Sequence, residues 1–245
     1  HSTTHCRKTA KSGKIKPMKY GSIPAGGQGL RLQPIGFSKE LAPVARRAVI
    51  EYLIERMVLA GIDKIFINTA EDKTDLIRYL SAKSVYAPHL IFLVRPRRGL
   101  LDGIILPEQF LRSDDELFFG LPDTIWYPKD GFAQVDRQSG DLVLGLFDTG
   151  TPERFDSVVI NSDNRIKSIE VKVDKPQSKW TWAIGKMTVQ VARALPRLPL
   201  FGEAMHEYCQ SHSCYAVQLP GSSCLDIGVG DDYDRADAFV KTHEK

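Results

Sequence analysis

The chain has 245 residues, 42% of them hydrophobic and 26% charged, which is typical of a globular protein that buries one substantial core. Its formal net charge of +3 is too small to indicate a protein that binds nucleic acid. No apolar run is long enough to cross a bilayer or to serve as a secretory signal. We therefore expect neither nucleic acid nor a membrane among its partners.

The cysteines indicate a reducing, cytoplasmic location, because no two of them are spaced as a C-x-x-C pair. They are Cys6, Cys209, Cys214 and Cys224. His206 and His212 lie near two of them in the sequence, but zinc needs four converging ligands, so residues 201–211 are interpreted as an amphipathic helix. Residues 1–17 are basic, polar and without periodicity, which indicates a disordered arm or an expression remnant.

From residue 18 to about residue 135, strand-like apolar runs alternate with helical patterns. The expected strands are 20–25, 64–68, 90–94 and 116–121. The expected helices are 47–60, 72–81 and 103–111. This alternation predicts a largely parallel sheet that helices cover on both faces.

Residues 140–200 differ, because short β-like runs are separated there by Asp-Thr-Gly and Ser-Asp-Asn turns. These runs are 142–148, 157–160, 165–172 and 182–189. A helix at 201–211, a strand at 215–219 and a final helix at 231–242 then return the chain to the core. The sequence thus predicts one domain over 18–245, with a Rossmann-like three-layer α/β/α fold, a mostly parallel mixed central sheet and a small β-rich insertion. The insertion is expected to form a pocket wall beyond the strands' carboxyl ends.

The most informative segment follows the first expected strand and reads Ala25-Gly26-Gly27-Gln28-Gly29-Leu30-Arg31. Its glycines can adopt positive φ, so successive N–H groups can form a concave nest for phosphate oxygens. Arg31 offers a planar fork of donors, and Lys39 adds a mobile point charge that could reach a different phosphorus. These parts are typical of a site for a nucleoside triphosphate.

Two other nucleotide-binding loops do not fit this glycine-rich segment. A dinucleotide fingerprint needs a third glycine where Leu32 stands, and no acidic residue follows the strand 64–68. A Walker A loop needs Gly-Lys-Ser/Thr at the start of a helix, which this segment lacks. An ordinary surface turn remains open for the loop taken alone.

Two aspartates lie where a triphosphate site needs a hard cation. Asp123 follows the expected strand 116–121, and Asp226 follows the strand 215–219 and a loop at 220–225. Mg²⁺ takes one or two carboxylates together with substrate oxygens and water, so this pair suits it. Either residue alone has another interpretation: Asp123 as a turn residue and Asp226 as a helix cap.

In this order, the motifs resemble those of the sugar-1-phosphate nucleotidyltransferases, or nucleotide-sugar pyrophosphorylases, and among them the glucose-1-phosphate thymidylyltransferase type. The resemblance runs from about residue 19 to about residue 240. Besides the glycine loop, it rests on Phe37-Ser38-Lys39-Glu40-Leu41-Ala42-Pro43-Val44, Leu121-Pro122-Asp123, Ser168-Ile169-Glu170-Val171-Lys172 and Leu225-Asp226-Ile227-Gly228.

The resemblance implies an enzyme that couples a nucleoside triphosphate with a sugar 1-phosphate and releases pyrophosphate. A homo-oligomer is also compatible with the sequence. It implies a nucleotide-binding half at about 18–135, a sugar-binding part at about 140–200 and a return to the core at 201–245. The implied catalytic residues are Arg31 for the leaving phosphates, Lys39 for the α-phosphate and Lys172 for the nucleophile, with Asp123 and Asp226 holding Mg²⁺. The implied nucleotide-binding residues are Ala25, Gly26, Gly27, Gln28, Gly29, Leu30 and Arg95. The implied sugar-binding residues are Glu170, Asp156 and Gly185.

The chain also departs from the family pattern. Leu30 replaces the usual threonine, Asp156 stands where glycine commonly lets the sugar approach the backbone, and Arg95 stands where glutamine often reads a pyrimidine. Two alternatives therefore stay open: a catalytically weakened nucleotide-sugar-binding or regulatory homologue, and transfer to a non-sugar phosphate such as phosphocholine.

Overall fold

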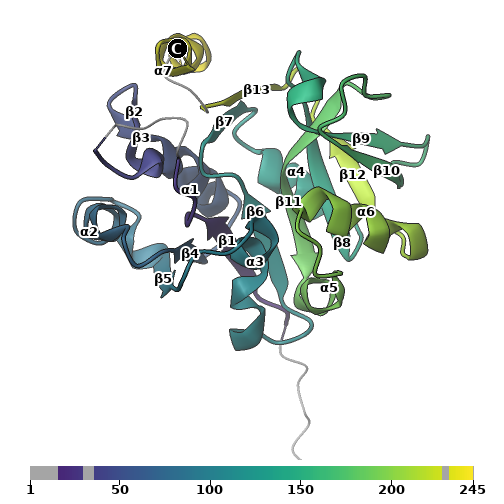
Figure 1. The fold of residues 1–245 in the computed structure, drawn as a ribbon, viewed down its shortest axis with the longest axis horizontal. Coiled ribbons are helices and arrows are strands. Elements are labelled where there is room, and N and C mark those ends of the chain that lie inside the picture. Colours follow the sequence, from purple (N-terminus) through teal and green to yellow (C-terminus); the bar gives the residue numbers. More distant parts are fainter. Residues whose placement is uncertain (1–15, 30–35, 228–231, 245) are drawn as a thin grey trace, which may run out of the picture.

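The computed structural model describes residues 16–29, 36–227 and 232–244. Within these ranges a nine-stranded sheet runs through the molecule (Figure 1), with strands in the order β10-β9-β11-β6-β1-β4-β5. β8 pairs with β11 and β12, so the sheet branches at β11. The predicted three-layer α/β fold with a mostly parallel mixed sheet is confirmed.

One half of the sheet is parallel. Its strands are β1 (Lys19–Pro24), β4 (Lys64–Thr69), β5 (Leu90–Val94) and β6 (Glu116–Gly120). β1 pairs with β4 on one side and β6 on the other, and β4 pairs with β5. Because all four run in the same direction, the segments that follow their last residues meet at one edge of the sheet.

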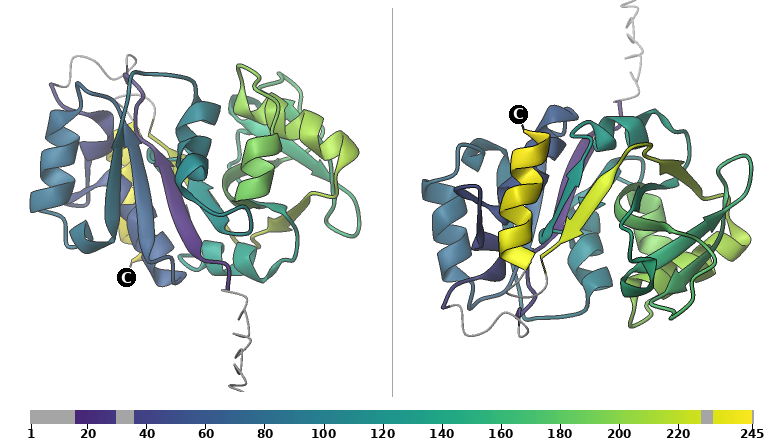
Figure 2. Two further views of the ribbon diagram at one scale, coloured as in Figure 1. Left: turned by 90° about the horizontal axis from the view of Figure 1, so that it is seen from below. Right: turned by 90° about the horizontal axis from the view of Figure 1, so that it is seen from above.

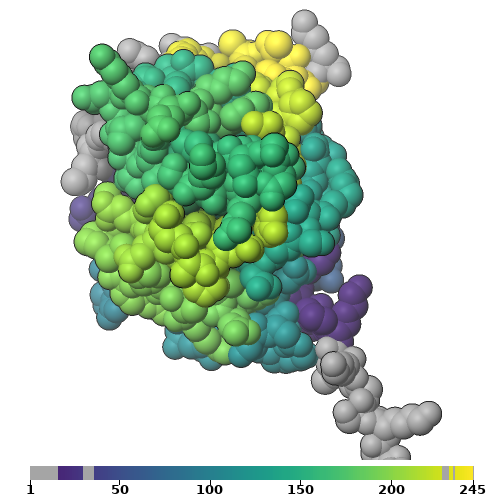
Figure 3. Space-filling model, turned by 90° about the vertical axis from the view of Figure 1, so that its right-hand side faces the viewer, coloured from purple at the N-terminus to yellow at the C-terminus, as the bar shows by residue number. Residues whose placement is uncertain are grey.

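The other half is mixed and forms the predicted β-rich part. Its strands are β8 (Leu142–Asp148), β9 (Asp156–Ile160), β10 (Ile166–Val171), β11 (Trp180–Thr188) and β12 (Tyr215–Gln218). β11 runs antiparallel to β6 and β8, and its register shifts between Trp182 and Ile184. Before that shift Thr181 pairs with β9, so the β9–β10 hairpin continues the sheet beyond the end of β6. Figure 3 shows this side of the molecule, where α6 and the hairpin form the surface.

Helices cover both faces of the sheet (Figure 2). On one face are α1 (Val49–Leu59), α2 (Thr74–Ala82) and α4 (Gly131–Arg137). On the other are α3 (Leu100–Ile105), α5 (Val189–Ala194) and α6 (Phe201–Ser211). β6 shows why two cores form: Phe118 packs with the α1 side, whereas Leu117 and Phe119 pack with the α3 side. Within the described ranges, no helix has the length and apolar character needed to span a membrane.

Several short elements were not predicted from the sequence. β2 (Pro43–Val44) pairs with β3 (Arg47–Ala48), so the helix expected from residue 47 begins at Val49. The helix expected at 103–111 begins at Leu100 and changes at Leu106 to a 3-10 helix, η4 (Leu106–Phe110), which carries Pro107 in its first turn. The other 3-10 helices are η2 (Lys39–Leu41), η3 (Ala87–His89) and η5 (Pro152–Arg154).

A two-stranded ribbon corrects the loop predicted at 220–225. β13 (Ser223–Asp226) pairs antiparallel with β7 (Thr124–Tyr127), and α7 (Asp232–His243) follows. The helix-cap interpretation of Asp226 does not hold, because this residue ends a strand. The predicted division of the chain into nucleotide-binding and sugar-binding parts concerns function and stays a prediction.

Candidate active site

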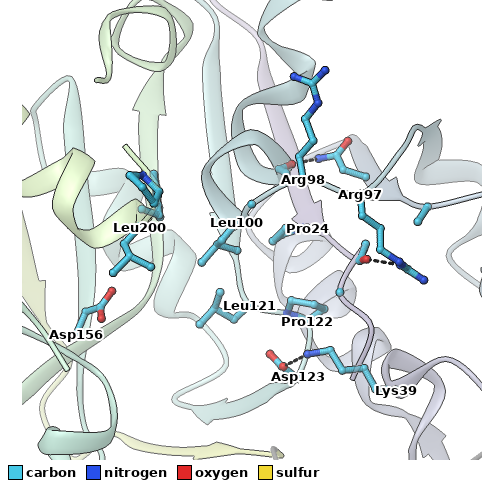
Figure 4. Close-up of a pocket in the computed structure, with 18 of the residues that line it drawn as sticks. Pro24, Lys39, Arg97, Arg98, Leu100, Leu121, Pro122, Asp123, Asp156 and Leu200 are labelled. Atoms are coloured by element: carbon cyan, nitrogen blue, oxygen red, sulfur yellow. Dashed lines mark hydrogen bonds and ion pairs between the residues drawn. The ribbon is translucent and has the colours of Figure 1, made fainter. Parts of the chain in front are cut away.

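A cleft of about 590 Å³ opens beyond the carboxyl ends of β1, β4 and β6 and faces the β9–β10 hairpin and the start of α6 (Figure 4). This is the edge where an open α/β sheet binds its ligands. Eight of the predicted site residues line it: Gly26, Gly27, Lys39, Arg95, Asp123, Asp156, Lys172 and Asp226. The fold thus brings together residues that are up to 200 positions apart in the sequence, as Gly26 and Asp226 show.

The glycine loop leaves β1 at the floor of the cleft. The buried N–H of Ala25 donates to the carbonyl of Asn68 (2.8 Å), which fixes the start of the loop to β4. Gly29 has a φ of 63°, and a Cβ there would lie 3.2 Å from Cβ of Lys39. Glycine is therefore needed both for the backbone conformation and for the approach of the lysine stem. Leu30 and Arg31 lie outside the described residues.

Lys39 is held at the cleft by its chain neighbours. The backbone N–H and the hydroxyl of Ser38 donate to the carboxylate of Asp75 in α2 at 2.6 and 2.7 Å. Both oxygens of the buried Glu40 accept from Nζ of Lys73 at 2.6 Å. Burial raises the pKa of Glu40 and lowers that of Lys73, and their opposite charges offset this cost. These contacts anchor η2 from both sides of Lys39.

The ammonium group of Lys39 forms an ion pair with the carboxylate of Asp123 (Figure 4). Burial acts to lower the pKa of Lys39, but the charge of Asp123 and its hydrogen bond, with smaller contributions from Glu40 and Asp226, raise it overall. Lys39 is therefore positively charged at neutral pH and lies among several carboxylates.

The β7–β13 ribbon brings the two predicted metal ligands together. Asp226 is the register partner of Thr124, the residue after Asp123, and the N–H of Ile227 donates to the carbonyl of Asp123 (2.9 Å). Two neighbouring carboxylates, one just before β7 and one at the end of β13, suit Mg²⁺, which completes its shell with substrate oxygens and water. In the part of the chain that the structure describes, no group of three or more His, Cys, Asp or Glu is placed so that it could hold a metal ion. Asp123 and Asp226 could hold the ion as a pair, because Mg²⁺ needs only one or two carboxylates.

The opposite wall of the cleft comes from the β-rich part. Asp156 is the first residue of β9, and Lys172 follows the last residue of β10. Lys172 has a φ of 49°, an unusual backbone conformation for a residue with a side chain. Apolar side chains line much of this wall, and Arg154 lines the cleft too; the apolar residues include Leu121, Phe155, Val171, Trp182, Leu200 and Phe201. Trp182 also packs in the core, because its ring contacts those of Phe119 and Phe201.

Arg97 is a cleft residue for which the sequence provided only a weak signal, its place in the basic run 95–98 after a strand. Its guanidinium donates to the carbonyl of Gly26 (2.7 Å) and pairs with Asp72. It therefore ties the glycine loop to the segment that follows β5. Burial lowers the pKa of Arg95, which lines the cleft beside it.

Five of the predicted site residues that the structure describes do not line the cleft, and Gly29, whose backbone is described above, is one of them. Ala25 is buried beneath it, and Gln28 is exposed. Gly185 lies within β11, where a Cβ would come 2.5 Å from the ring of Phe119, so packing between strands accounts for the glycine. Glu170 instead accepts from the backbone N–H of Gln177 (2.8 Å), outside the cleft.

The family model described as nucleotidyl transferase matches residues 21–243, nearly all of this structure. The chain belongs to that family. This nucleotidyltransferase is 31% identical over 239 residues to the glucose-1-phosphate thymidylyltransferase of Neisseria meningitidis serogroup A, covering 91% of this chain and 82% of the relative. It is 26% identical to the enzyme of the same name from Mycolicibacterium smegmatis, covering 91% of this chain and 83% of the relative. The prediction of a nucleotidyltransferase enzyme is confirmed.

Solved structures of the same fold are also known. A putative glucose-1-phosphate thymidylyltransferase from Bacillus anthracis, in complex with a sucrose, has a TM-score of 0.80 and 22% identity, covering 91% of this chain and 95% of that one. A UTP-bound UGPase from Acinetobacter baumannii has a TM-score of 0.79 and 16% identity, covering 93% and 94%. At these identities the comparison establishes the fold of this nucleotidyltransferase.

Proposed function

We propose that this nucleotidyltransferase couples a nucleoside triphosphate with a sugar 1-phosphate, releases pyrophosphate and uses Mg²⁺. The observation that supports the proposal most strongly is the β7–β13 pairing, in which Asp226 ends β13 opposite Thr124 and Asp123 comes immediately before Thr124, paired with Lys39. The names of the curated relatives support a sugar 1-phosphate as the acceptor.

In this reaction, an oxygen of the acceptor phosphate forms a bond to the α-phosphorus of the triphosphate. The bond from the α-phosphorus to the bridging oxygen breaks, and the electron pair leaves with pyrophosphate. The protein needs no covalent step, so positioning and charge neutralisation carry the catalysis. Asp123 and Asp226 would hold Mg²⁺, which when bound would neutralise charge on the phosphates.

The chain's own residues divide this work by position. Lys39, on the glycine-loop side, is proposed to steady the α-phosphate, and the N–H groups of Gly26 and Gly27 to bind phosphate oxygens. Lys172, on the opposite wall, is proposed to orient the acceptor phosphate. Arg31 stays a prediction for the leaving phosphates. Two anions must meet, and a lysine on each side of the cleft lowers their repulsion.

A screen of common nucleoside triphosphates against sugar 1-phosphates, followed by pyrophosphate release, tests the proposal. Release is expected only when both substrates are present. Asp123→Asn and Asp226→Asn should each lower turnover by roughly 100-fold or more, while the exposed Asp163→Asn retains it. Full activity in both cleft variants would show that the metal assignment is wrong.

The same screen addresses the alternative of a binding homologue. Such a protein would bind a nucleotide sugar in calorimetry without releasing pyrophosphate from any triphosphate. The presence of Lys39 and Lys172 in one cleft favours turnover, because a binding protein has less need of a cation on each side.

A further inference from the structure

An arginine from outside the glycine loop holds one of the peptide groups of that loop. Arg97 lies three residues after the end of β5, and its Nη1 donates to the carbonyl oxygen of Gly26 at 2.7 Å (Figure 4). Its Nη2 pairs with the carboxylate of Asp72, in the turn before α2. One guanidinium thus connects a carbonyl of the loop to a carboxylate on another element.

The hydrogen bond to Gly26 fixes the direction of the next N–H group. A trans peptide is planar, so its C=O and its N–H point in opposite directions. Because the carbonyl of Gly26 is directed at Arg97, the N–H of Gly27 is directed away from Arg97. This N–H is one of the two donors proposed to bind phosphate oxygens.

The N–H of Gly27 is available to a ligand. Gly27 is exposed, and its N–H donates to none of the residues that the structure describes. A Cβ built on Gly27 would lie 3.9 Å from Nζ of Lys39, so this part of the loop is close to the ammonium group proposed to hold the α-phosphate. A phosphate beside Lys39 would therefore lie next to this stretch of backbone.

Without Arg97, little would restrain the peptide group between Gly26 and Gly27. The preceding residue is fixed to β4, because the N–H of Ala25 donates to the carbonyl of Asn68 and the carbonyl of Ala25 accepts from Oγ1 of Thr69 at 3.3 Å. The peptide that follows lies between two glycines, and neither has a Cβ that would restrict its rotation. After half a turn, a partially negative carbonyl oxygen would point where the N–H had pointed, and it would repel a phosphate.

The contacts of Arg97 favour a positioning role over direct binding of phosphate. Both of its Nη groups are engaged, one with the loop carbonyl and one with Asp72. A phosphate would have to compete with these partners for the guanidinium. The ion pair with Asp72 also holds the guanidinium in the orientation that reaches the carbonyl of Gly26.

We infer that Arg97, held by Asp72, is a positioning residue for the triphosphate, because it keeps the N–H of Gly27 directed at the phosphate site. The inference rests on the proposed function, which it makes more specific. It assigns Arg97 to the affinity for the triphosphate, whereas the acceptor phosphate belongs to Lys172 on the opposite wall.

Calorimetry of the protein with Mg²⁺ and a nucleoside triphosphate, without an acceptor, tests the inference. The triphosphate that the wild-type protein binds most tightly is used for every variant. Arg97→Met should weaken its binding roughly tenfold, because the Gly27 donor is no longer held in place. Asp72→Asn should weaken binding by a smaller factor, and the double variant should bind no more weakly than Arg97→Met alone. Arg78→Met, at an exposed position of α2, should keep the wild-type affinity.

Steady-state kinetics provides a readout that a general loss of structure would not reproduce. In Arg97→Met, KM for the triphosphate should rise roughly tenfold, while KM for the sugar 1-phosphate should change by less than about twofold. A proportional rise in both constants would overturn the inference, because it would indicate damage to the whole cleft.

The direction of the Asp72→Asn effect separates positioning from direct contact. Tighter binding of the triphosphate in this variant would overturn the inference, because it would mean that the released guanidinium of Arg97 binds phosphate itself. Unchanged binding in Arg97→Met would overturn it as well. The binding experiment does not depend on turnover. The expected losses of affinity without pyrophosphate release with any acceptor would therefore support the role of Arg97 and contradict the proposed function, so the two failures are distinguishable.

Discussion

Lys39 carries two roles at one position, since its ammonium group pairs with Asp123 and is also the proposed partner of the α-phosphate. The positive charge beside Asp123 is the kind of charge that a divalent cation would supply there. Lys39 and the metal are therefore expected to compete for the same carboxylate until a triphosphate draws the lysine away.

Replacing this lysine separates metal binding from turnover. In Lys39→Met, Asp123 loses its partner, so Mn²⁺ or Mg²⁺ should bind the nucleotide-free protein several-fold more tightly. Pyrophosphate release should nevertheless fall by roughly 100-fold, because the α-phosphate loses a cation. Titration with Mn²⁺ followed by electron paramagnetic resonance measures the first effect, with the exposed Lys167→Met as the control. Unchanged or weaker metal binding would contradict the competition.

Lys172 has a backbone conformation that favours glycine, although the proposed function needs its side chain. Its φ of 49° is one that glycine adopts without penalty, whereas a residue with a Cβ loses roughly 1–2 kcal/mol there. A lysine that keeps its side chain in this backbone conformation at a cleft is consistent with the proposed role of Lys172 in binding the acceptor phosphate.

Two variants that both lack the ammonium group test this strain. Lys172→Gly should have a free energy of unfolding about 1 kcal/mol higher than Lys172→Ala, the reverse of the order at an ordinary strand position. Both should lose pyrophosphate release to the same extent. Urea unfolding compares the pair, and a more stable alanine variant would show that the position is not strained.

Among the elements, η2 is held in place by contacts with Asp75 in α2 and with Lys73, the residue before α2. Ser38 donates twice to Asp75 on one side of Lys39, and the Glu40–Lys73 pair fixes the other side. Burial acts to raise the pKa of Asp75, but the hydrogen bonds from Ser38 and from the N–H of Leu76 outweigh it and lower this pKa overall.

The lowered pKa sets the pH range in which this attachment stabilises the fold. A carboxyl group whose pKa is lower in the folded state stabilises it above the ordinary value of 3.8, and this contribution is lost as the pH falls through the lowered value. Ser38→Ala should therefore cost about 1 kcal/mol at pH 7, and the cost should shrink as the pH falls below 3.8 and through the lowered pKa of Asp75. Urea midpoints at several pH values, with the exposed Ser162→Ala as control, measure it. A cost independent of pH would contradict the role of the Asp75 charge.

For the whole molecule, local periodicity predicted the sheet well. The runs that became β5, β8 and α6 were predicted with the bounds the structure has, because strand and helix periods were clear there. The site residues that follow parallel strands also came together as expected, since such strands end at one edge. Short elements whose pairing partner is about 100 residues away could not be predicted, as β13 and β7 show.

Side-chain placement was harder to predict than the strands. Glycine at position 185 fits both a sugar contact and close strand packing, and only the position of the Phe119 ring decides between them. Asp156 was predicted as a sugar contact, but the placement of its carboxylate depends on Trp182 and Gly202, which come from other elements. These details arise from tertiary packing that local sequence does not encode.

The proposed function requires that the cleft joins two phosphates and does not merely hydrolyse a triphosphate. Phosphorus nuclear magnetic resonance of a reaction containing a nucleoside triphosphate, an acceptor phosphate and Mg²⁺ tests it most directly. The proposed function predicts pyrophosphate together with a new diphosphate in which the α-phosphorus couples to the acceptor phosphorus, and it predicts neither signal with Asp226→Asn. Nucleoside monophosphate and pyrophosphate with no coupled diphosphate, or an unchanged triphosphate with every acceptor, would contradict it.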